Sequence, residues 1–195
     1  LAIKKFNIKE INIQNNYLIK DKEIKDSLIL IYNTNLIFLN NSQIENILKQ
    51  NTFIESFIIK KKYPNILNIE IIEKEPFAIL FNKKKKFYLS KKIELIEYKK
   101  IKRYESLPYV FGSKEEFEIL YNNLKVINFP FDIVKKYIFF DSKRWDLETL
   151  DGIIVKLPNK NYNESLKNFL KIKNKNSFKK YLVFDYRIPD QLILK

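Results

Sequence analysis

The segment YPNILNIEIIEKEPFA, residues 63–78, decides the fold of this chain. Leu67, Ile69 and Ile71 alternate with the polar residues Asn68 and Glu70. An apolar side chain at every second position is typical of a strand with one face on a core. Glu73 continues the apolar series with a carboxylate, so we expect the strand to leave the core there. The segment therefore predicts a half-buried strand.

Two of the six prolines bracket this strand. Pro64 has no backbone N–H and a fixed φ, which predicts a turn before the strand begins to pair. Pro76 is expected to end the ladder for the same reason, and it restricts the preceding residue, Glu75, to an extended conformation. An extended residue makes a short, stiff connection, so we expect a domain boundary near residues 74–77.

The composition limits the functions available to the chain. Its 195 residues suit one large or two small domains, and 46% hydrophobic with 31% charged residues is typical of a globular protein. The absence of Cys and His excludes thiolate nucleophiles, serine–histidine relays and the usual zinc sites. Two glycines, Gly112 and Gly152, are too few for a phosphate-binding loop. We therefore expect no catalytic activity and no cofactor.

The formal net charge of +14 has three explanations. Clustered lysines favour binding to nucleic acid or a mild attraction to anionic lipid headgroups. The chain is also rich in Lys, Ile, Asn, Phe and Tyr, whose codons are rich in A and T, so a biased genome would produce the same excess. The lysine runs at 60–62 and 83–86 are predicted to be solvated turns. We expect no specific nucleic-acid binding.

Hydrophobic periodicity predicts the elements up to the quoted strand. A change of apolar parity after Ile8 predicts a bulge or a strand end. Ser42 and Glu45 have the spacing of a capping box, which predicts a helix that begins there. The predicted order is strand, helix, helix, strand, strand, over residues 6–13, 21–28, 42–48, 53–61 and 66–73.

Short strands dominate the sequence beyond Pro76. Ser113 and Glu116 repeat the capping-box spacing before an apolar helical stripe. Asp151-Gly152 predicts a hairpin, because glycine accepts a positive φ without steric penalty. The predicted strands are 77–81, 86–90, 93–98, 134–141, 145–150, 153–157, 181–185 and 191–194, with a further helix around 166–170.

The quoted segment resembles the end of the POTRA domain in the bacterial cell-division family FtsQ, called DivIB in Gram-positive bacteria. The family pattern is Pro-x-x-Leu-x-Ile-x-Ile-x-Glu-(Arg or Lys)-x-Pro-x-Ala, and the matching residues are Pro64, Leu67, Ile69, Ile71, Glu73, Lys74, Pro76 and Ala78. The resemblance covers nearly the whole chain, with further matches at residues 51–56, 107–112, 144–145, 151–157 and 185–187. It departs from the family's glycines at residues 15–16, 90–93 and 158.

The resemblance implies an α+β fold and a scaffold rather than an enzyme. A POTRA domain of β-α-α-β-β order is expected at residues 1–75, followed at 76–195 by a mixed β-domain with helices packed on a curved sheet. Family members are single-pass proteins of the inner membrane, and their periplasmic domains act at the division septum. Because the chain has no Met, even at position 1, we expect a fragment whose membrane anchor lies in a missing N-terminal segment.

The resemblance also implies partners and a binding edge. The family binds FtsB, and with it FtsL, by letting a partner strand add to its last strand. The corresponding candidate residues are Tyr186, Arg187, Ile188, Gln191, Leu192, Ile193 and Leu194. A strand at a chain end is also expected to be an edge on physical grounds. In the alternative interpretation, these residues only complete the sheet and Lys195 protects its edge.

A second candidate site lies in the POTRA part. By position in the family, Ile59 and Lys61 correspond to residues implicated in recruiting the protein to the septum, through an FtsK-type protein. In the alternative interpretation, Lys61 belongs to an ordinary solvated lysine run.

Other classes of function remain open alternatives. A POTRA protein of secretion or outer-membrane assembly would carry further POTRA copies or a β-barrel. A basic nucleic-acid-binding protein would bind in a strongly salt-dependent manner. An enzyme could use Asp141 and Asp146 as an acid and a base, but nothing else in the sequence supports a catalytic pocket. Trp145 is expected in the core and Asp151 in a turn.

Overall fold

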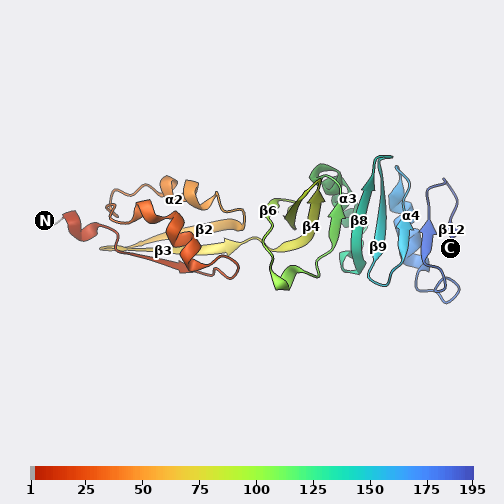
Figure 1. Ribbon diagram of the computed structural model, residues 1–195, viewed down its shortest axis with the longest axis horizontal. Coiled ribbons are helices and arrows are strands. Elements are labelled where there is room, and N and C mark those ends of the chain that lie inside the picture. The colour runs from red at the N-terminus through yellow and green to blue at the C-terminus, as the bar shows by residue number, and fades with distance from the viewer. Residues whose placement is uncertain (1–2) are drawn as a thin grey trace. The chain divides into compact units, whose positions relative to one another are not determined.

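The computed structural model describes residues 3–195 and divides the chain into two compact units, Leu1–Glu75 and Pro76–Lys195 (Figure 1). Each unit has its own sheet and its own helices. Among the described residues, no helix has the length and apolar character needed to cross a membrane.

The first unit has the predicted β-α-α-β-β order. Its three strands form a sheet in the order β1-β3-β2, with β1 parallel and β2 antiparallel to the central β3. Leu67, Ile69 and Ile71 of β3 are fully buried, as their alternation predicts. The elements are η1 (Ile3–Phe6), β1 (Glu10–Gln14), α1 (Asp21–Ser27), η2 (Ile29–Ile31), α2 (Asn41–Leu48), β2 (Ile54–Lys62) and β3 (Ile66–Glu73).

Three local predictions for this unit were wrong in their boundaries. The first strand begins at Glu10, because residues 3–6 form the 3₁₀ turn η1 and Ile8 exchanges hydrogen bonds with Asn33 and Thr34 instead of joining the sheet; the break that the parity change after Ile8 predicts is therefore present. The helix predicted at Ser42 begins one residue earlier, with Asn40 as its cap: the Asn40 side chain accepts a hydrogen bond from the Ser42 backbone N–H. Strand β3 itself has its predicted range, 66–73, but its ladder ends at Glu73 and does not run on to Pro76, which was expected to end it.

The second unit holds a single mixed sheet of nine strands. Pro76 opens its first strand and pairs with Ser90, so this proline begins a ladder instead of ending one. The strand order is β12-β11-β10-β9-β8-β7-β4-β5-β6. The strands are β4 (Pro76–Asn82), β5 (Lys85–Ser90), β6 (Leu95–Glu97), β7 (Tyr109–Phe111), β8 (Val134–Phe140), β9 (Arg144–Thr149), β10 (Ile154–Lys156), β11 (Val183–Asp185) and β12 (Ile193–Leu194); the 3₁₀ turns are η3 (Lys102–Tyr104) and η4 (Phe131–Ile133).

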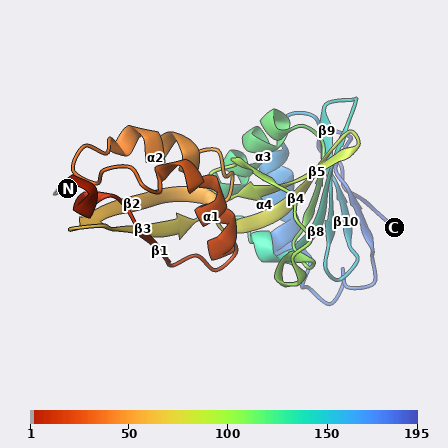
Figure 2. The ribbon, with the colours of Figure 1, turned by 60° about the vertical axis from the view of Figure 1, so that its left-hand side comes forward.

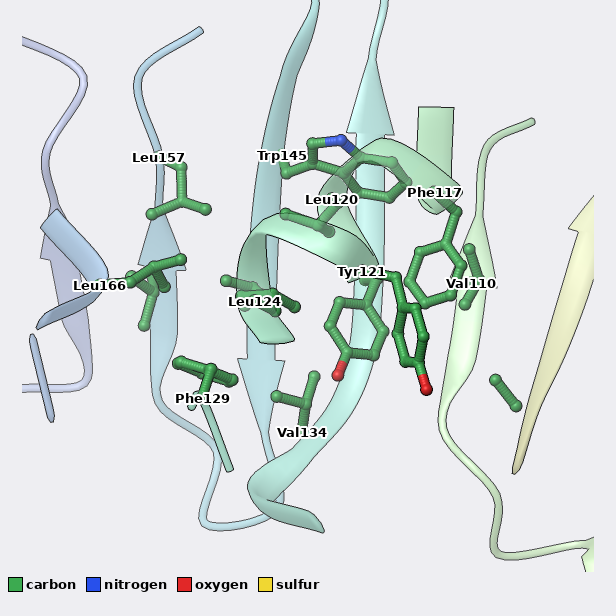
Figure 3. Packing of buried hydrophobic residues seen from close by; sticks show 14 of the residues in the cluster. Val110, Phe117, Leu120, Tyr121, Leu124, Phe129, Val134, Trp145, Leu157 and Leu166 are labelled. Carbon is green, nitrogen blue, oxygen red and sulfur yellow. The ribbon is translucent and has the colours of Figure 1, made fainter. Parts of the chain in front are cut away.

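Two helices cover one face of this sheet, α3 (Lys114–Val126) and α4 (Tyr162–Ile172) (Figure 2). The Ser113 hydroxyl accepts a hydrogen bond from the Glu116 backbone N–H at 3.2 Å, which confirms the predicted cap. Figure 3 shows residues of α3, including Phe117 and Leu120, packed with side chains of the strands, Trp145 among them. The indole ring of Trp145 is buried, with its centroid 4.9 Å from that of Phe139.

The predicted hairpin at Asp151-Gly152 is present between β9 and β10. Gly152 has a φ of +85°, a value that residues with a Cβ rarely adopt. The other glycine, Gly112, lies where a Cβ would approach Phe139 to 3.0 Å and Trp145 to 3.2 Å. The two glycines therefore stand at a turn and at a close packing contact.

Candidate functional site

The last strand, β12, forms one end of the nine-stranded sheet, where β11 is its only partner among residues 3–195. Val183 and Lys195 exchange both backbone hydrogen bonds, at 2.9 and 3.1 Å. In an antiparallel ladder, hydrogen-bonded pairs alternate with pairs whose backbone groups point outward. The pair of Phe184 and Leu194 comes next to the hydrogen-bonded pair of Val183 and Lys195, so it is of the second kind. The N–H and C=O of Leu194 therefore point away from β11. This is an open edge to which another strand can add.

A loop of residues 186–192 joins β11 to β12, although Gln191 and Leu192 were expected to be part of the strand. Its centre is a turn in which the Gln191 N–H donates to the Ile188 carbonyl at 3.2 Å, and Asp190 has a φ of +60°. The exposed side chains of Ile188 and Pro189 lie in this turn. Ile188 therefore lies in the loop next to β12 and is not part of the edge strand itself.

Asp185 and Arg187 form the clamp that fastens this loop. The Arg187 guanidinium donates to both carboxylate oxygens of Asp185, at 2.8 and 2.6 Å, and the Arg187 backbone N–H donates to the same carboxylate at 3.1 Å. These hydrogen bonds hold the pKa of the Asp185 carboxyl below its ordinary value and raise the pKa of Arg187. Arg187 is thus held charged next to the open edge.

Tyr186 points the opposite way, into the unit. It is buried, and its hydroxyl donates to the side-chain oxygen of Asn168 on α4 at 2.8 Å. Burial raises the pKa of the Tyr186 hydroxyl. A partner strand at the edge would meet Arg187 and Ile193, whereas Tyr186 fixes the loop against α4.

A pocket of about 920 Å³ lies between α4, the chain before it and the 186–192 loop. Its lining contains four cations, namely Lys160, Lys167, Lys171 and Arg187, and two acids, Glu164 and Asp190. Lys167 is partly neutralised by Glu164, whose carboxylate lies 2.8 Å from the lysine nitrogen. Arg187 is itself paired with Asp185, so four cations face three acids here and the excess is about one positive charge, which favours an acidic over a basic segment as the ligand of this pocket.

The outer face of the same sheet carries paired charges. Asp146 is buried and accepts a hydrogen bond from Arg144, but its burial has the larger effect and raises the pKa of its carboxyl. Glu148 accepts a hydrogen bond from Lys136 at 2.7 Å, which lowers its pKa. Asp141 is exposed in the turn after β8. No group of acids in the described part of the chain could hold a metal ion.

The two POTRA candidates lie on β2, an edge strand of the small sheet. Ile59 is half-buried and pairs with Ile69, while the Lys61 ammonium donates to the Leu39 carbonyl at 2.7 Å. Lys60, between them, forms an ion pair with Glu70. Lys61 therefore has a structural role in tying β2 to the connection before α2.

Sequence reasoning missed the role of Glu73. Its carboxylate accepts hydrogen bonds from the backbone N–H groups of Tyr17, Leu18 and Ile19, at distances of 2.8 to 3.0 Å. The signal was present, because Glu73 falls at an apolar position at the end of a central strand. A carboxylate placed there can reach the loop that leaves the neighbouring parallel strand, β1.

Two family models match the chain over almost all of its length. The FtsQ-type POTRA domain matches residues 6–74, and the C-terminal domain of the cell division protein FtsQ/DivIB matches residues 78–187. Because the POTRA match is of the FtsQ type, a POTRA protein of secretion or outer-membrane assembly is disfavoured.

The curated proteins most similar to this chain by sequence include cell division proteins named FtsQ. Cell division protein FtsQ of Bradyrhizobium diazoefficiens is 27% identical over 83% of this chain and 48% of its own length, and FtsQ of Rickettsia bellii is 28% identical over 83% and 61%. The solved extracytoplasmic domain of DivIB from Geobacillus stearothermophilus is 13% identical, with a TM-score of 0.37 over 52% of this chain and 92% of that one. The chain spans about half to three fifths of these two relatives. It belongs to the FtsQ/DivIB family of bacterial cell division proteins.

Proposed function

We propose that this chain is the extracytoplasmic part of a division scaffold that binds FtsB, and with it FtsL, by strand addition to β12. The observation that carries the proposal is the outward N–H and C=O of Leu194 at the open end of a nine-stranded sheet. A partner strand would take up these groups in a main-chain ladder, which supplies affinity without regard to sequence.

Side chains around the edge would select the partner. Ile193 on the edge is exposed and offers an apolar contact, while Lys160 and Lys171 of the neighbouring pocket favour acidic residues. An FtsB segment with an extended stretch next to acidic residues fits both features. The two units would act as separate domains, 1–75 and 76–195.

The proposed location is the division septum, with this part of the protein on the periplasmic side of the inner membrane and its anchor in a preceding segment. Recruitment through Ile59 and an FtsK-type protein has weaker support, because Lys61 already has an internal partner. The exposed backbone edge of β2 is what such a partner would use.

The decisive experiment compares two substitutions at Leu194 in binding to the extracytoplasmic segments of FtsB and FtsL. Leu194→Ala removes the side chain but keeps the outward N–H, whereas Leu194→Pro removes both. We expect the proline variant to bind at least about tenfold more weakly than the alanine variant, because a lost ladder hydrogen bond and a steric clash together cost more than 1.4 kcal/mol. Equal affinities of the two variants would contradict strand addition at this edge.

Nucleic-acid binding is the competing explanation for the charge of +14. A poly-dT oligonucleotide measured at two salt concentrations serves as the control. Binding to FtsB–FtsL that persists at moderate salt supports the scaffold function. Binding only to the oligonucleotide, and its loss in salt, would assign the charge to nucleic acid instead.

A further inference from the structure

The connection between α1 and α2, residues 28–40, is unlike the rest of the chain. Residues 27–44 contain no charged side chain, in a protein in which 31% of residues are charged. Ile31, Leu36 and Leu39 of the connection are buried and hold it to the unit. Leu28 is also buried and Tyr32 is half-buried, whereas four other large apolar residues are exposed: Ile29, Leu30, Ile37 and Phe38.

The degree of exposure is high for side chains of this size. Leu30 is 82% exposed and Phe38 is 78% exposed. Single exposed apolar residues are common on soluble proteins, but four within ten residues of one connection exceed that pattern, and exposed apolar residues that gather on a surface mark a binding site. These side chains do not contribute to the core, so folding alone does not account for them.

Lysines frame this apolar segment. The Leu36 N–H donates to the Phe6 carbonyl at 2.8 Å, which places η1, with Lys4 and Lys5, beside the connection. The Lys61 ammonium binds the Leu39 carbonyl, which places the β2–β3 hairpin there as well. Figures 1 and 2 both show η1 and this hairpin at the same end of the small sheet.

The hairpin adds Lys62 and Tyr63, both exposed. The ring of Tyr63 lies 6.3 Å from that of Phe6, in an edge-to-face arrangement. None of the three segments 4–8, 33–39 and 61–66 contains an acidic residue. This end of the unit therefore combines protruding apolar side chains with unbalanced positive charge.

We infer that this surface, the basic apolar end of the first unit, binds the surface of an anionic lipid bilayer. Apolar side chains that enter the headgroup region, with lysines around them that pair with phosphates, are the two features of interfacial membrane binding. Aromatic rings such as those of Phe38 and Tyr63 also favour that region. Nucleic acid fits less well, because Ile29, Leu30 and Ile37 have no ring on which a base can stack.

The first test compares matched apolar substitutions in the whole chain. Binding is measured by co-sedimentation with vesicles of equal phosphatidylglycerol and phosphatidylcholine. The double substitution Leu30→Ser and Phe38→Ser is expected to lower the binding constant at least about tenfold. Val126→Ser with Leu150→Ser removes two residues of similar exposure, 77% and 64%, from the second unit and is expected to leave binding unchanged.

The second test compares matched charge reversals. Lys4→Glu, Lys5→Glu and Lys62→Glu together change the net charge by the same amount as Lys83→Glu, Lys84→Glu and Lys85→Glu in the second unit. We expect about a fivefold loss for each lysine in the first set and little loss in the second. Equal losses would mean that net charge alone drives binding and would overturn the inference.

Two further outcomes would also overturn it: no binding to the anionic vesicles, or binding of poly-dT that depends on the same residues in place of vesicle binding. The inference goes beyond the proposed scaffold function. Its vesicle measurement needs no division protein, so the two proposals can fail independently.

Discussion

The loop after β1 and the edge strand β12 both have backbone N–H groups that no neighbouring strand takes up, and the two places differ in whether the chain supplies another acceptor. After β1, three successive N–H groups of residues 17–19 are all bound by one carboxylate, that of Glu73. At β12, the N–H of Leu194 points outward from the edge of the sheet. The first arrangement is closed and stabilises the fold. The second is open, which is what an interaction edge requires.

The largest effect is expected at the closed arrangement. Glu73→Ala leaves three N–H groups without their acceptor, one of them in the buried residue Ile19, so we expect the free energy of unfolding to fall by about 2–3 kcal/mol. Urea denaturation followed by circular dichroism measures this change. Glu10→Ala, an exposed glutamate of the same sheet, is the control and should change stability by less than about 0.5 kcal/mol. A similar small effect for Glu73→Ala would show that the carboxylate does not hold this loop.

A smaller effect is expected at Asp185, whose carboxylate also binds a backbone N–H group, beside the open edge. It accepts one backbone N–H and a two-point ion pair from Arg187, whose side chain is 44% exposed. Because that exposure weakens the ion pair, we expect Asp185→Asn to lower the stability of the second unit by about 1–2 kcal/mol at pH 7.

The pH dependence of this contribution has a definite sign. The folded pKa of Asp185 lies below its unfolded value, so its contribution is complete above the unfolded pKa of about 3.9 and is lost as the pH falls through the lower folded pKa. The stability difference between the parent and Asp185→Asn should therefore shrink below about pH 4. A difference that grew on acidification would contradict the clamp.

Asp146 should show the opposite sign. Burial raises its folded pKa above the unfolded value, so the folded state binds a proton more readily, and stability falls as the pH rises between the two pKa values. Asp146→Asn removes this slope. Urea titrations of the parent and both aspartate variants at pH 3.5, 4.5, 5.5 and 7 give the stability of each variant relative to the parent. On acidification, the contribution of Asp185 to the free energy of unfolding should fall and that of Asp146 should rise. If the stability of the parent and that of Asp146→Asn changed in parallel with pH, burial would not outweigh the Arg144 contact in setting the pKa of Asp146.

Local patterns identified most of the elements of both sheets. The alternation of Leu67, Ile69 and Ile71 is enough to predict β3, since only a strand buries every second residue. Ser113 was a correct cap because its neighbours offered no competing acceptor, whereas at α2 the better-placed Asn40 took the role expected of Ser42. Asn and Ser are both good caps, and the backbone geometry that decides between them cannot be read from the sequence, so the predicted cap was two residues too late.

The candidate site was less accessible to sequence reasoning. That the last strand is an edge followed from its place in the chain, but the outward direction of Leu194 depends on the register with β11, which no local pattern encodes. Tyr186 and Arg187 were both named as residues of the edge, yet Tyr186 points into the unit and donates to Asn168, and the pocket beside it depends on the packing of α4. Glu73 stood out as a carboxylate at an apolar position, but its three donors lie over fifty residues earlier.

The smallest effect is expected at Lys61, where the question is whether a lysine serves the fold or a partner. Lys61→Met keeps the length of the side chain and removes the hydrogen bond to the Leu39 carbonyl, so we expect a loss of about 0.5–1 kcal/mol in the stability of the first unit. Lys62→Met, at an exposed neighbour, should cost less than about 0.5 kcal/mol. Urea denaturation of the two variants decides the matter. If they are equally stable, the tie between β2 and Leu39 contributes nothing, and Lys61, like the Leu194 backbone, is a group left open for a partner.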